Sequence, residues 1–322
     1  MTSPNAAFTE MVTTTLRSTK RRISDNVTNH NGLLTWMKDK GNIKTDHEGG
    51  YEIQLPLSWA NNATYSRFFG GDVQNIGASD VLTSAKYDWC EAAIHVTVNQ
   101  RELNMNRSEE RMINLVKARL DVAMASAANN MSVDIYSDGA LTNQIGGLQT
   151  LITVDGTGTV GGINAATYTF WKNQFLDMSA PATYSALRND MNTIWLRCVR
   201  GKDKPDLLVF THDIYTTYEN GLMDLQRYND TTSSMAAKSG FETLKYKTAS
   251  MIFDNNTNYG STAERGYFLN TDHLYLIEHP EGRWAEQETK TPINQFVNIT
   301  PMYWMGQMAT DARFLQGLLF DS

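Results

Sequence analysis

The feature that most constrains the fold is a pair of strand-like segments that flank a long polar stretch. Residues 51–59, YEIQLPLSW, alternate between polar and apolar side chains, and residues 80–98 are again rich in strand-forming residues. The intervening residues, about twenty in number, are polar and contain glycine. We therefore expect a long hairpin that protrudes from the body. A two-stranded hairpin cannot bury both of its faces alone, so it needs another surface to lie on.

A long helix is expected after this hairpin. Asn106 can cap its start, and Glu109 follows three residues later, where a carboxylate suits the positive end of the helix dipole. Apolar residues then recur at three- and four-residue steps for about 25 residues, roughly 40 Å of helix at the standard rise. This stripe consists of Met112, Val116, Leu120, Ala123, Ala127 and Met131.

The rest of the chain alternates helical and strand patterns. One helix face is predicted to hold Leu187, Met191, Ile194, Trp195 and Cys198, and Gly201 supplies a stop. Further expected elements are a buried strand over 205–213, a helix from about Asp213 to Tyr228, strands within 244–254 and 265–279, and closing strands after 295. The sequence thus predicts an α+β protein with one long helix, a projecting hairpin and a compact mixed domain.

Charge is unevenly distributed along the 322 residues. The net charge of −7 argues against a surface built entirely to coat nucleic acid. Residues 1–45 nevertheless carry seven basic and three acidic residues, a net +4, so the remainder carries −11. A basic arm on an acidic body suggests an anionic partner at one end only. Lys20, Arg21 and Arg22 are either a phosphate-facing cluster in this arm or an ordinary solvated turn.

Cysteine content and hydropathy indicate the cellular compartment in which the chain is made. Cys90 and Cys198 form neither a disulfide framework nor a metal-binding pair, and no apolar run has the length of a signal peptide or a membrane span. We therefore expect synthesis in a reducing cytoplasm and no membrane partner. The six histidines lack metal-ligand spacing, and no nucleophile elbow is present. No catalytic residue, metal or cofactor is predicted.

One motif favours a different class of protein. Gly156, Gly158 and Gly161 match the G-x-G-x-x-G pattern of a dinucleotide-binding loop. That loop must leave a strand and open a helix, so that phosphate meets free backbone N–H groups. The residues after Gly161 show no clear helical stripe, and no acidic residue follows at the required distance. A glycine-rich surface turn is the better interpretation, and a nucleotide-binding enzyme remains the alternative from another class.

The order of these elements resembles the major capsid proteins of tailed bacteriophages, which have the HK97-type fold. Short sequence segments also resemble those of this family. They are GGYEIQLPLSWANNATYSRFFGGD, QIGGLQTLI and, as the most specific match, GTGTVGGINAATYTFWKNQ. The resemblance covers the chain from Gly49 to the end, whereas the first 48 residues match only in position and character. It implies these divisions: N-terminal arm 1–48, E-loop hairpin 49–98, P-domain with spine helix 99–138, A-domain 139–275, and a return to the P-domain over 276–322.

The resemblance also implies a structural function. Copies would form hexamers and pentamers that tile an icosahedral shell around double-stranded DNA, held non-specifically, in a virion assembled in the cytoplasm of a bacterial host. Partners would include a portal and, as an open question, cement or decoration proteins. The short arm leads us to expect a separate scaffolding protein. An encapsulin-like cellular nanocompartment is the alternative within the same fold.

Two sets of residues follow from the resemblance. Tyr65, Arg67, Phe68 and Phe69 at the hairpin tip would contact a neighbouring subunit, and the Lys20–Arg22 cluster would face the interior and its DNA. Some relatives join an E-loop lysine covalently to another subunit. The tip of this hairpin has no lysine, and Lys86 lies on the returning strand, so we predict no such cross-link.

Overall fold

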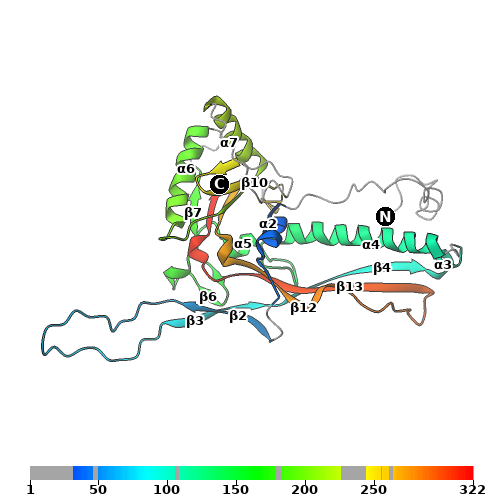
Figure 1. Ribbon diagram of the computed structural model, residues 1–322, viewed down its shortest axis with the longest axis horizontal. Helices are drawn as coiled ribbons and strands as arrows, with labels where there is room; N and C mark the ends of the chain where they lie inside the picture. Colours follow the sequence, from blue (N-terminus) through cyan, green and yellow to red (C-terminus); the bar gives the residue numbers. More distant parts are fainter. Residues whose placement is uncertain are drawn as a thin grey trace.

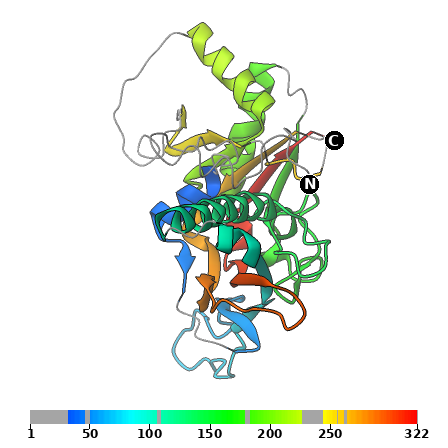
Figure 2. The ribbon, with the colours of Figure 1, turned by 90° about the vertical axis from the view of Figure 1, so that its right-hand side faces the viewer.

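The computed structural model describes residues 32–45, 50–105, 109–178, 183–225, 244–254, 256–260 and 264–321. Over these residues the chain forms two main sheets, a long helix beside one of them, and a hairpin that projects from the body (Figure 1). Figure 2 gives the view at right angles, in which the long helix is seen nearly end-on. The fold class is the α+β class that the sequence predicts.

The first main sheet has four strands in the order β1-β12-β13-β4. Its strands are β1 (Ile43–Lys44), β12 (Leu274–Glu286), β13 (Val297–Thr310) and β4 (Cys90–Asn99). β13 pairs antiparallel with both neighbours, in register from Val297 opposite Asn99 to Gly306 opposite Cys90. The aromatic, alternating C-terminal segment is therefore sheet, as its pattern predicts.

The long helix α4 (Glu109–Asp134) runs along this sheet beside β4 (Figure 1). It follows the short helix α3 (Gln100–Met105). Ala127 and Met131, two residues of the predicted stripe, are buried at its C-terminal half. Arg119 fastens the helix to the strand by donating a hydrogen bond to the Thr97 carbonyl oxygen over 2.9 Å. The expected cap, Asn106, lies outside the described residues.

The second main sheet has six strands in the order β7-β14-β11-β8-β10-β9. Its strands are β7 (Gln174–Asp177), β14 (Gly317–Phe320), β11 (Arg265–Leu269), β8 (Leu207–Phe210), β10 (Ala249–Phe253) and β9 (Leu244–Tyr246). Helices α6 (Tyr184–Cys198) and α7 (His212–Leu225) pack on one face. All four residues of β8 are buried because both faces of the sheet are covered, which explains its continuous apolar run.

Helix α6 confirms the sequence prediction in detail. All five residues assigned to its apolar face are buried against the six-stranded sheet. The helix ends at Cys198, and Gly201 shortly beyond it has φ +61°, a conformation that glycine adopts readily. The predicted helix after β8 is also present, although its described part begins at His212 and ends at Leu225.

The segment expected to be an extended arm is packed over its described part. Helix α2 (Gly32–Lys40) buries Leu33, Trp36 and Met37 in the main core, and β1 pairs parallel with β12. The Lys40 ammonium group contacts the carboxylates of Asp206 and Asp272. Residues 32–45 therefore belong to the body, because three large apolar side chains at helical spacing find a core to enter. Part of the basic charge assigned to the arm is neutralised there.

Strand pairing crosses two of the expected divisions of the chain, and the divisions themselves stay predictions. The hairpin pairing ends where Glu52 meets Asp88, and β4 leaves to join the four-stranded sheet instead of extending the hairpin to residue 98. Residues 276–322 do not stay together either, since β14 pairs with β11 and β7 in the six-stranded sheet. Both pairings join segments that are distant in the sequence, which local patterns do not specify.

The remaining elements are short. They are the hairpin strands β2 (Glu52–Ser58) and β3 (Leu82–Asp88), the strands β5 (Thr159–Val160) and β6 (Ile163–Asn164), helix α5 (Leu148–Leu151), and the single turns η1 (Thr169–Trp171), η2 (Thr271–His273) and η3 (Arg313–Leu315). Among the described helices, none combines the length and apolar character needed to cross a membrane.

Candidate assembly surfaces

The tip of the hairpin exposes an apolar cluster. Beyond the paired strands β2 and β3, five large apolar side chains point into solvent: Tyr65 (82% exposed), Phe68 (62%), Phe69 (89%), Val73 (100%) and Ile76 (94%). Burial of apolar surface is worth about 25 cal/mol per Å², so leaving this cluster in water forgoes considerable stabilisation. An exposed group of this kind is typical of a surface that another molecule covers.

A compact turn presents two of these rings. The Asp72 carboxylate accepts a hydrogen bond from the Phe69 N–H over 2.9 Å, and the Asp72 N–H donates to the Phe69 carbonyl oxygen over 3.2 Å. Gly70 within the turn has φ +53°. Arg67 lies between Tyr65 and Phe68 in the sequence and is also exposed. The tip is thus a shaped turn with aromatic rings and one cation.

The base of the same hairpin is firmly attached to the body. Ile53, Leu57, Ala85 and Tyr87 enter the main core from one face of the two strands. The Tyr87 hydroxyl donates to the Thr310 carbonyl oxygen over 2.8 Å, and burial raises the pKa of this phenol well above its usual range. The hairpin therefore has a core at its base and none at its tip.

Aromatic rings continue this attachment toward the tip. The Trp59 ring meets Tyr168 edge-to-face, with the two ring centroids 6.0 Å apart and the planes at 83°. Phe170 lies 6.4 Å from the same indole. Such pairs add about 0.5–1.5 kcal/mol beyond the area they bury. The residues after the glycine motif therefore serve as a platform for the hairpin base.

The glycine motif itself forms a second, small hairpin. Gly161 and Gly162 have φ +59° and +75° and make the two-residue turn between β5 and β6. The Gly161 carbonyl oxygen accepts from the Lys86 N–H over 2.9 Å, which ties this turn to β3. A Cβ at Gly161 would lie 2.9 Å from the Ala85 Cβ. This glycine therefore permits a close approach between the turn and the projecting hairpin.

This geometry lacks what a dinucleotide site requires. A phosphate-binding glycine loop opens onto the N-terminus of a helix, where several backbone N–H groups are free. Here strand β6 follows the glycines directly. The predicted surface turn is correct for Gly158, around which nothing lies within 4 Å of an added Cβ. It is wrong for Gly156, which is buried and whose added Cβ would lie 2.9 Å from the Asn173 carbonyl oxygen. It is incomplete for Gly161, which packs against β3.

A buried arginine, Arg313, binds the segment around the glycine motif by hydrogen bonds. Arg313 donates from Nε to the Leu151 carbonyl oxygen over 2.6 Å and from Nη2 to the Thr157 carbonyl oxygen over 3.0 Å. Nη2 also reaches the Thr153 hydroxyl over 2.9 Å. Burial lowers the pKa of Arg313 to about 10. Sequence reasoning missed this residue, because an arginine that binds backbone carbonyl groups far along the chain leaves no local pattern.

A titratable pair lies beside the hairpin base. Nδ1 of His273 is 2.8 Å from Oδ1 of Asp311, and the Tyr275 hydroxyl donates to the other carboxylate oxygen over 3.3 Å. The hydrogen bond to Asp311 raises the pKa of His273 above 6.5, although partial burial opposes this. His273 and Asp311 line a cavity of about 150 Å³ with Leu57 and Ser58 of β2. This pair therefore borders the junction between hairpin and body.

The residues singled out from the sequence fall in different places. Tyr65, Arg67, Phe68 and Phe69 lie together at the exposed tip, and their contact with a neighbour stays a prediction. The cluster of Lys20, Arg21 and Arg22 lies outside the described residues. Lys86 sits at the hairpin base, where its Nζ is 3.4 Å from Glu52 Oε2. Within the part of the chain that the structure describes, no three His, Cys, Asp or Glu side chains are grouped to hold a metal ion.

Comparison with solved structures identifies the fold. The chain is similar to a chain of the capsid asymmetric unit of cyanophage A-1(L), with a TM-score of 0.69, 12% identity, and coverage of 95% of this chain and 97% of that one. It is similar to the capsid of Myoviridae phage XM1, with a TM-score of 0.56, 13% identity, and coverage of 94% and 95%. A third similar structure is the holo-SrpI encapsulin complex of Synechococcus elongatus, with a TM-score of 0.61, 8% identity, and coverage of 95% and 93%.

These similarities extend over nearly the whole chain, although little sequence identity accompanies them. No protein-family model matches the sequence, and comparison with curated proteins likewise gives no match. The chain has the HK97-type capsid fold, in the α+β class predicted from the sequence. Since one fold can host several functions, the fold alone does not define the function of this chain.

Proposed function

We propose that this chain is the major capsid protein of a tailed bacteriophage. In this function it assembles with itself into hexamers and pentamers, which form an icosahedral shell around double-stranded DNA. The HK97-type fold and its similarity to phage capsid proteins along the whole chain support the proposal. Assembly would take place in the host cytoplasm, with the virion capsid as the final location. The proposal includes no enzymatic step.

The projecting hairpin is the observation that carries this proposal. Its base is buried in the body, whereas its tip exposes three aromatic rings with no core of its own. Such a tip does not stabilise a monomer, because its aromatic rings stay in water and ordering the loop still costs conformational entropy. A neighbouring subunit would bury them. The hairpin therefore serves a contact between copies.

A loop-shortening variant tests this role. Replacement of residues 61–79 by Asn-Gly keeps Trp59, Val81 and their hydrogen bond at the hairpin base, while removing the whole tip. We expect a folded chain with native circular dichroism that no longer forms rings or shells in size-exclusion chromatography and electron microscopy. Full-length particles in normal yield from this variant would contradict the proposal.

The proposed cargo, DNA, depends on the basic N-terminal segment. Lys20, Arg21 and Arg22 would face the interior and neutralise phosphate, since cationic side chains release counterions from DNA without reading its sequence. Reversal of all three residues to Glu should leave the fold intact and lower the yield of DNA-filled particles. Normal yields of filled particles would remove this role from the cluster.

An encapsulin-like nanocompartment is a second candidate function. The similarity to the holo-SrpI encapsulin complex, with a TM-score of 0.61, supports this candidate, since the similarity to the capsid of phage XM1 has a TM-score of 0.56. Such a shell would enclose a protein cargo in place of DNA. DNase treatment of purified particles separates the two: protected double-stranded DNA supports the phage capsid, and particles with protein cargo and no protected DNA support the nanocompartment.

We also propose that the mature shell lacks the lysine cross-link of some relatives. No lysine occurs between residues 59 and 81, and Lys86 is engaged beside Glu52 at the hairpin base. Denaturing electrophoresis of mature particles should give a single band at the monomer mass. A ladder of covalent multimers would refute this.

A further inference from the structure

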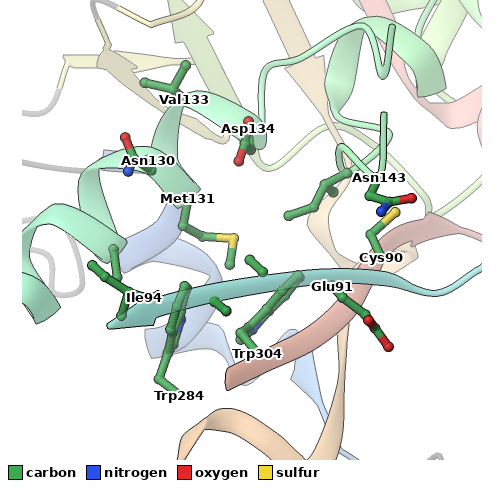
Figure 3. Close-up of a pocket in the computed structure, with 14 residues that line it drawn as sticks. Cys90, Glu91, Ile94, Asn130, Met131, Val133, Asp134, Asn143, Trp284 and Trp304 are labelled. Atoms are coloured by element: carbon green, nitrogen blue, oxygen red, sulfur yellow. The ribbon is translucent and has the colours of Figure 1, made fainter. Parts of the chain in front are cut away.

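A pocket of about 380 Å³ lies between the C-terminal half of α4 and the strand β4 (Figure 3). It forms where small side chains meet, since Ala127 of the helix and Ala92 of the strand both line it. Met131 and Ile94 give it apolar walls. Pockets that bind small organic molecules have volumes of about 300–1,000 Å³. This pocket is therefore large enough for a small ligand.

An indole ring closes one side of the pocket. Trp284 of β12 stacks on Trp304 of β13, with the ring planes at 25° and the centroids 6.4 Å apart. Trp304 is fully buried, and its Nε1–H donates to Glu278 Oε1 over 2.8 Å. Trp284 is only partly buried and lines the pocket, so its ring is the one that a ligand can reach.

The backbone around Trp284 is irregular. The pairing of β12 with β13 shifts register between Glu278 and Arg283, and again between Arg283 and Ala285. Trp284 lies within the second shift and has φ +53°, which is costly for a bulky side chain. Bulges and strained residues recur beside active sites and ligand-binding sites, where the surrounding structure fixes them. The strain therefore points to a function for the Trp284 ring.

The pocket is negatively charged. Glu91 and Asp134 line it, and within the described part of the chain no basic side chain does. Helix α4 also ends at Asp134, and the C-terminus of a helix carries about half a negative charge. Glu91 accepts from the Tyr303 hydroxyl over 2.9 Å. Asp134 accepts from the Gln144 amide over 3.0 Å. Because both of these donors are neutral, they leave the charge of each carboxylate in place.

Cys90 experiences the same negative potential. Its thiol lines the pocket and donates to the Gln144 carbonyl oxygen over 3.2 Å. Burial raises the pKa of this thiol, and the carboxylates of Asp88 and Asp134 raise it further. The surroundings thus disfavour a negative charge on the sulfur. By the same physics they favour a positive charge on a ligand.

We propose that this pocket binds a small organic cation, an ammonium group carried on an apolar body. The ammonium group contacts the Trp284 ring, since tryptophan offers the best face for a cation, and Glu91 and Asp134 attract it from β4 and α4. The apolar body lies against Met131. A cavity of about 150 Å³ holds a benzene molecule, so about 380 Å³ has room for a benzene ring with a trimethylammonium group.

Calorimetric titration of the purified full-length chain tests the proposal with three matched probes. Benzyltrimethylammonium is the cation, benzyl alcohol is neutral, and phenylmethanesulfonate carries the opposite charge on the same ring. The cation should bind saturably, with one ligand per chain and on the order of tenfold more tightly than the alcohol, and the sulfonate should not bind. Failure of the cation to bind, or equal affinity for the alcohol or the sulfonate, would overturn the proposal.

Single substitutions locate the site. Glu91→Gln and Asp134→Asn remove a charge and keep an acceptor oxygen, and Trp284→Leu removes the ring. Each should weaken binding of benzyltrimethylammonium on the order of tenfold. Asp121→Asn is the matched control, because it removes an exposed carboxylate of the same helix outside the pocket. Unchanged affinity in all three pocket variants, or an equal loss in the control, would overturn this location.

The probe comparison uses the unsubstituted chain, so it decides the matter even if a variant fails to fold. Circular dichroism identifies such a variant. None of these outcomes depends on assembly, so the ligand site can fail while the proposed shell function stands.

Discussion

Substitution of Gly161 by alanine isolates the contact that fixes the hairpin to the body. Gly161 has φ +59°, and a methyl group there would lie 2.9 Å from the Ala85 Cβ and 3.2 Å from the Tyr87 ring. Neither neighbour can move freely, since Ala85 is part of β3 and the Tyr87 hydroxyl is bound to Thr310. The turn between β5 and β6 must therefore shift, together with its hydrogen bond from Lys86.

The expected magnitude has two parts. A left-handed backbone costs a non-glycine residue about 1–2 kcal/mol, and overpacking in a well-packed site costs about 1–3 kcal/mol. Gly162→Ala is the matched control, since Gly162 has φ +75° with nothing within 4 Å of an added Cβ. It carries the backbone cost alone. Gly161→Ala should therefore lower the free energy of unfolding by ~1–3 kcal/mol more than Gly162→Ala does.

Urea unfolding of the two variants in the same oligomeric state measures this difference. Hydrogen exchange supplies a local readout, because the Lys86 amide donates to Gly161 and should exchange faster in Gly161→Ala than in Gly162→Ala. Equal destabilisation by the two substitutions, or an unchanged exchange rate of the Lys86 amide, would refute the view that packing of the Gly161 turn on β3 stabilises the hairpin base.

Three further predictions concern the body. Because the pKa of His273 is raised in the folded state, its pairing with Asp311 contributes its full stabilisation below pH 6.5, and this contribution is lost as pH rises through the folded-state pKa. NMR titration of His273 should show the raised pKa, and the substitution Asp311→Asn should abolish the rise. Leu187→Ala should cost about 2–5 kcal/mol in urea unfolding, whereas the same change at Leu196, 63% exposed on the same helix, should stay within about 0.5 kcal/mol. Arg313→Met should cost more than ~2 kcal/mol, because buried carbonyl groups lose their donors; unchanged stability would contradict this.

Local sequence patterns were sufficient to predict structure where the spacing of apolar residues within one element indicates which of its faces is buried. The face of α6 could be predicted because five apolar residues at helical spacing have one way to meet a sheet. The hairpin could be predicted because two alternating segments flank a polar stretch. These features depend on short-range periodicity.

Long-range pairing explains what the sequence did not reveal. β1 joins β12 across more than two hundred residues, and β14 crosses back to the six-stranded sheet; neither pairing could be read from local patterns. Arg313 binds carbonyl groups of a distant segment, and Gly161 owes its role to a contact with β3. A pocket of about 380 Å³ combines residues of α4, β4, β12 and β13, which only the folded chain brings together (Figure 3).

Electron microscopy of the purified assembly tests the central claim most directly. We expect closed icosahedral shells built from hexamers and pentamers, in which the hairpin tip of each copy lies on a neighbouring copy. A chain that remains a monodisperse monomer, with its hairpin tip in solvent at every concentration examined, would contradict the claim.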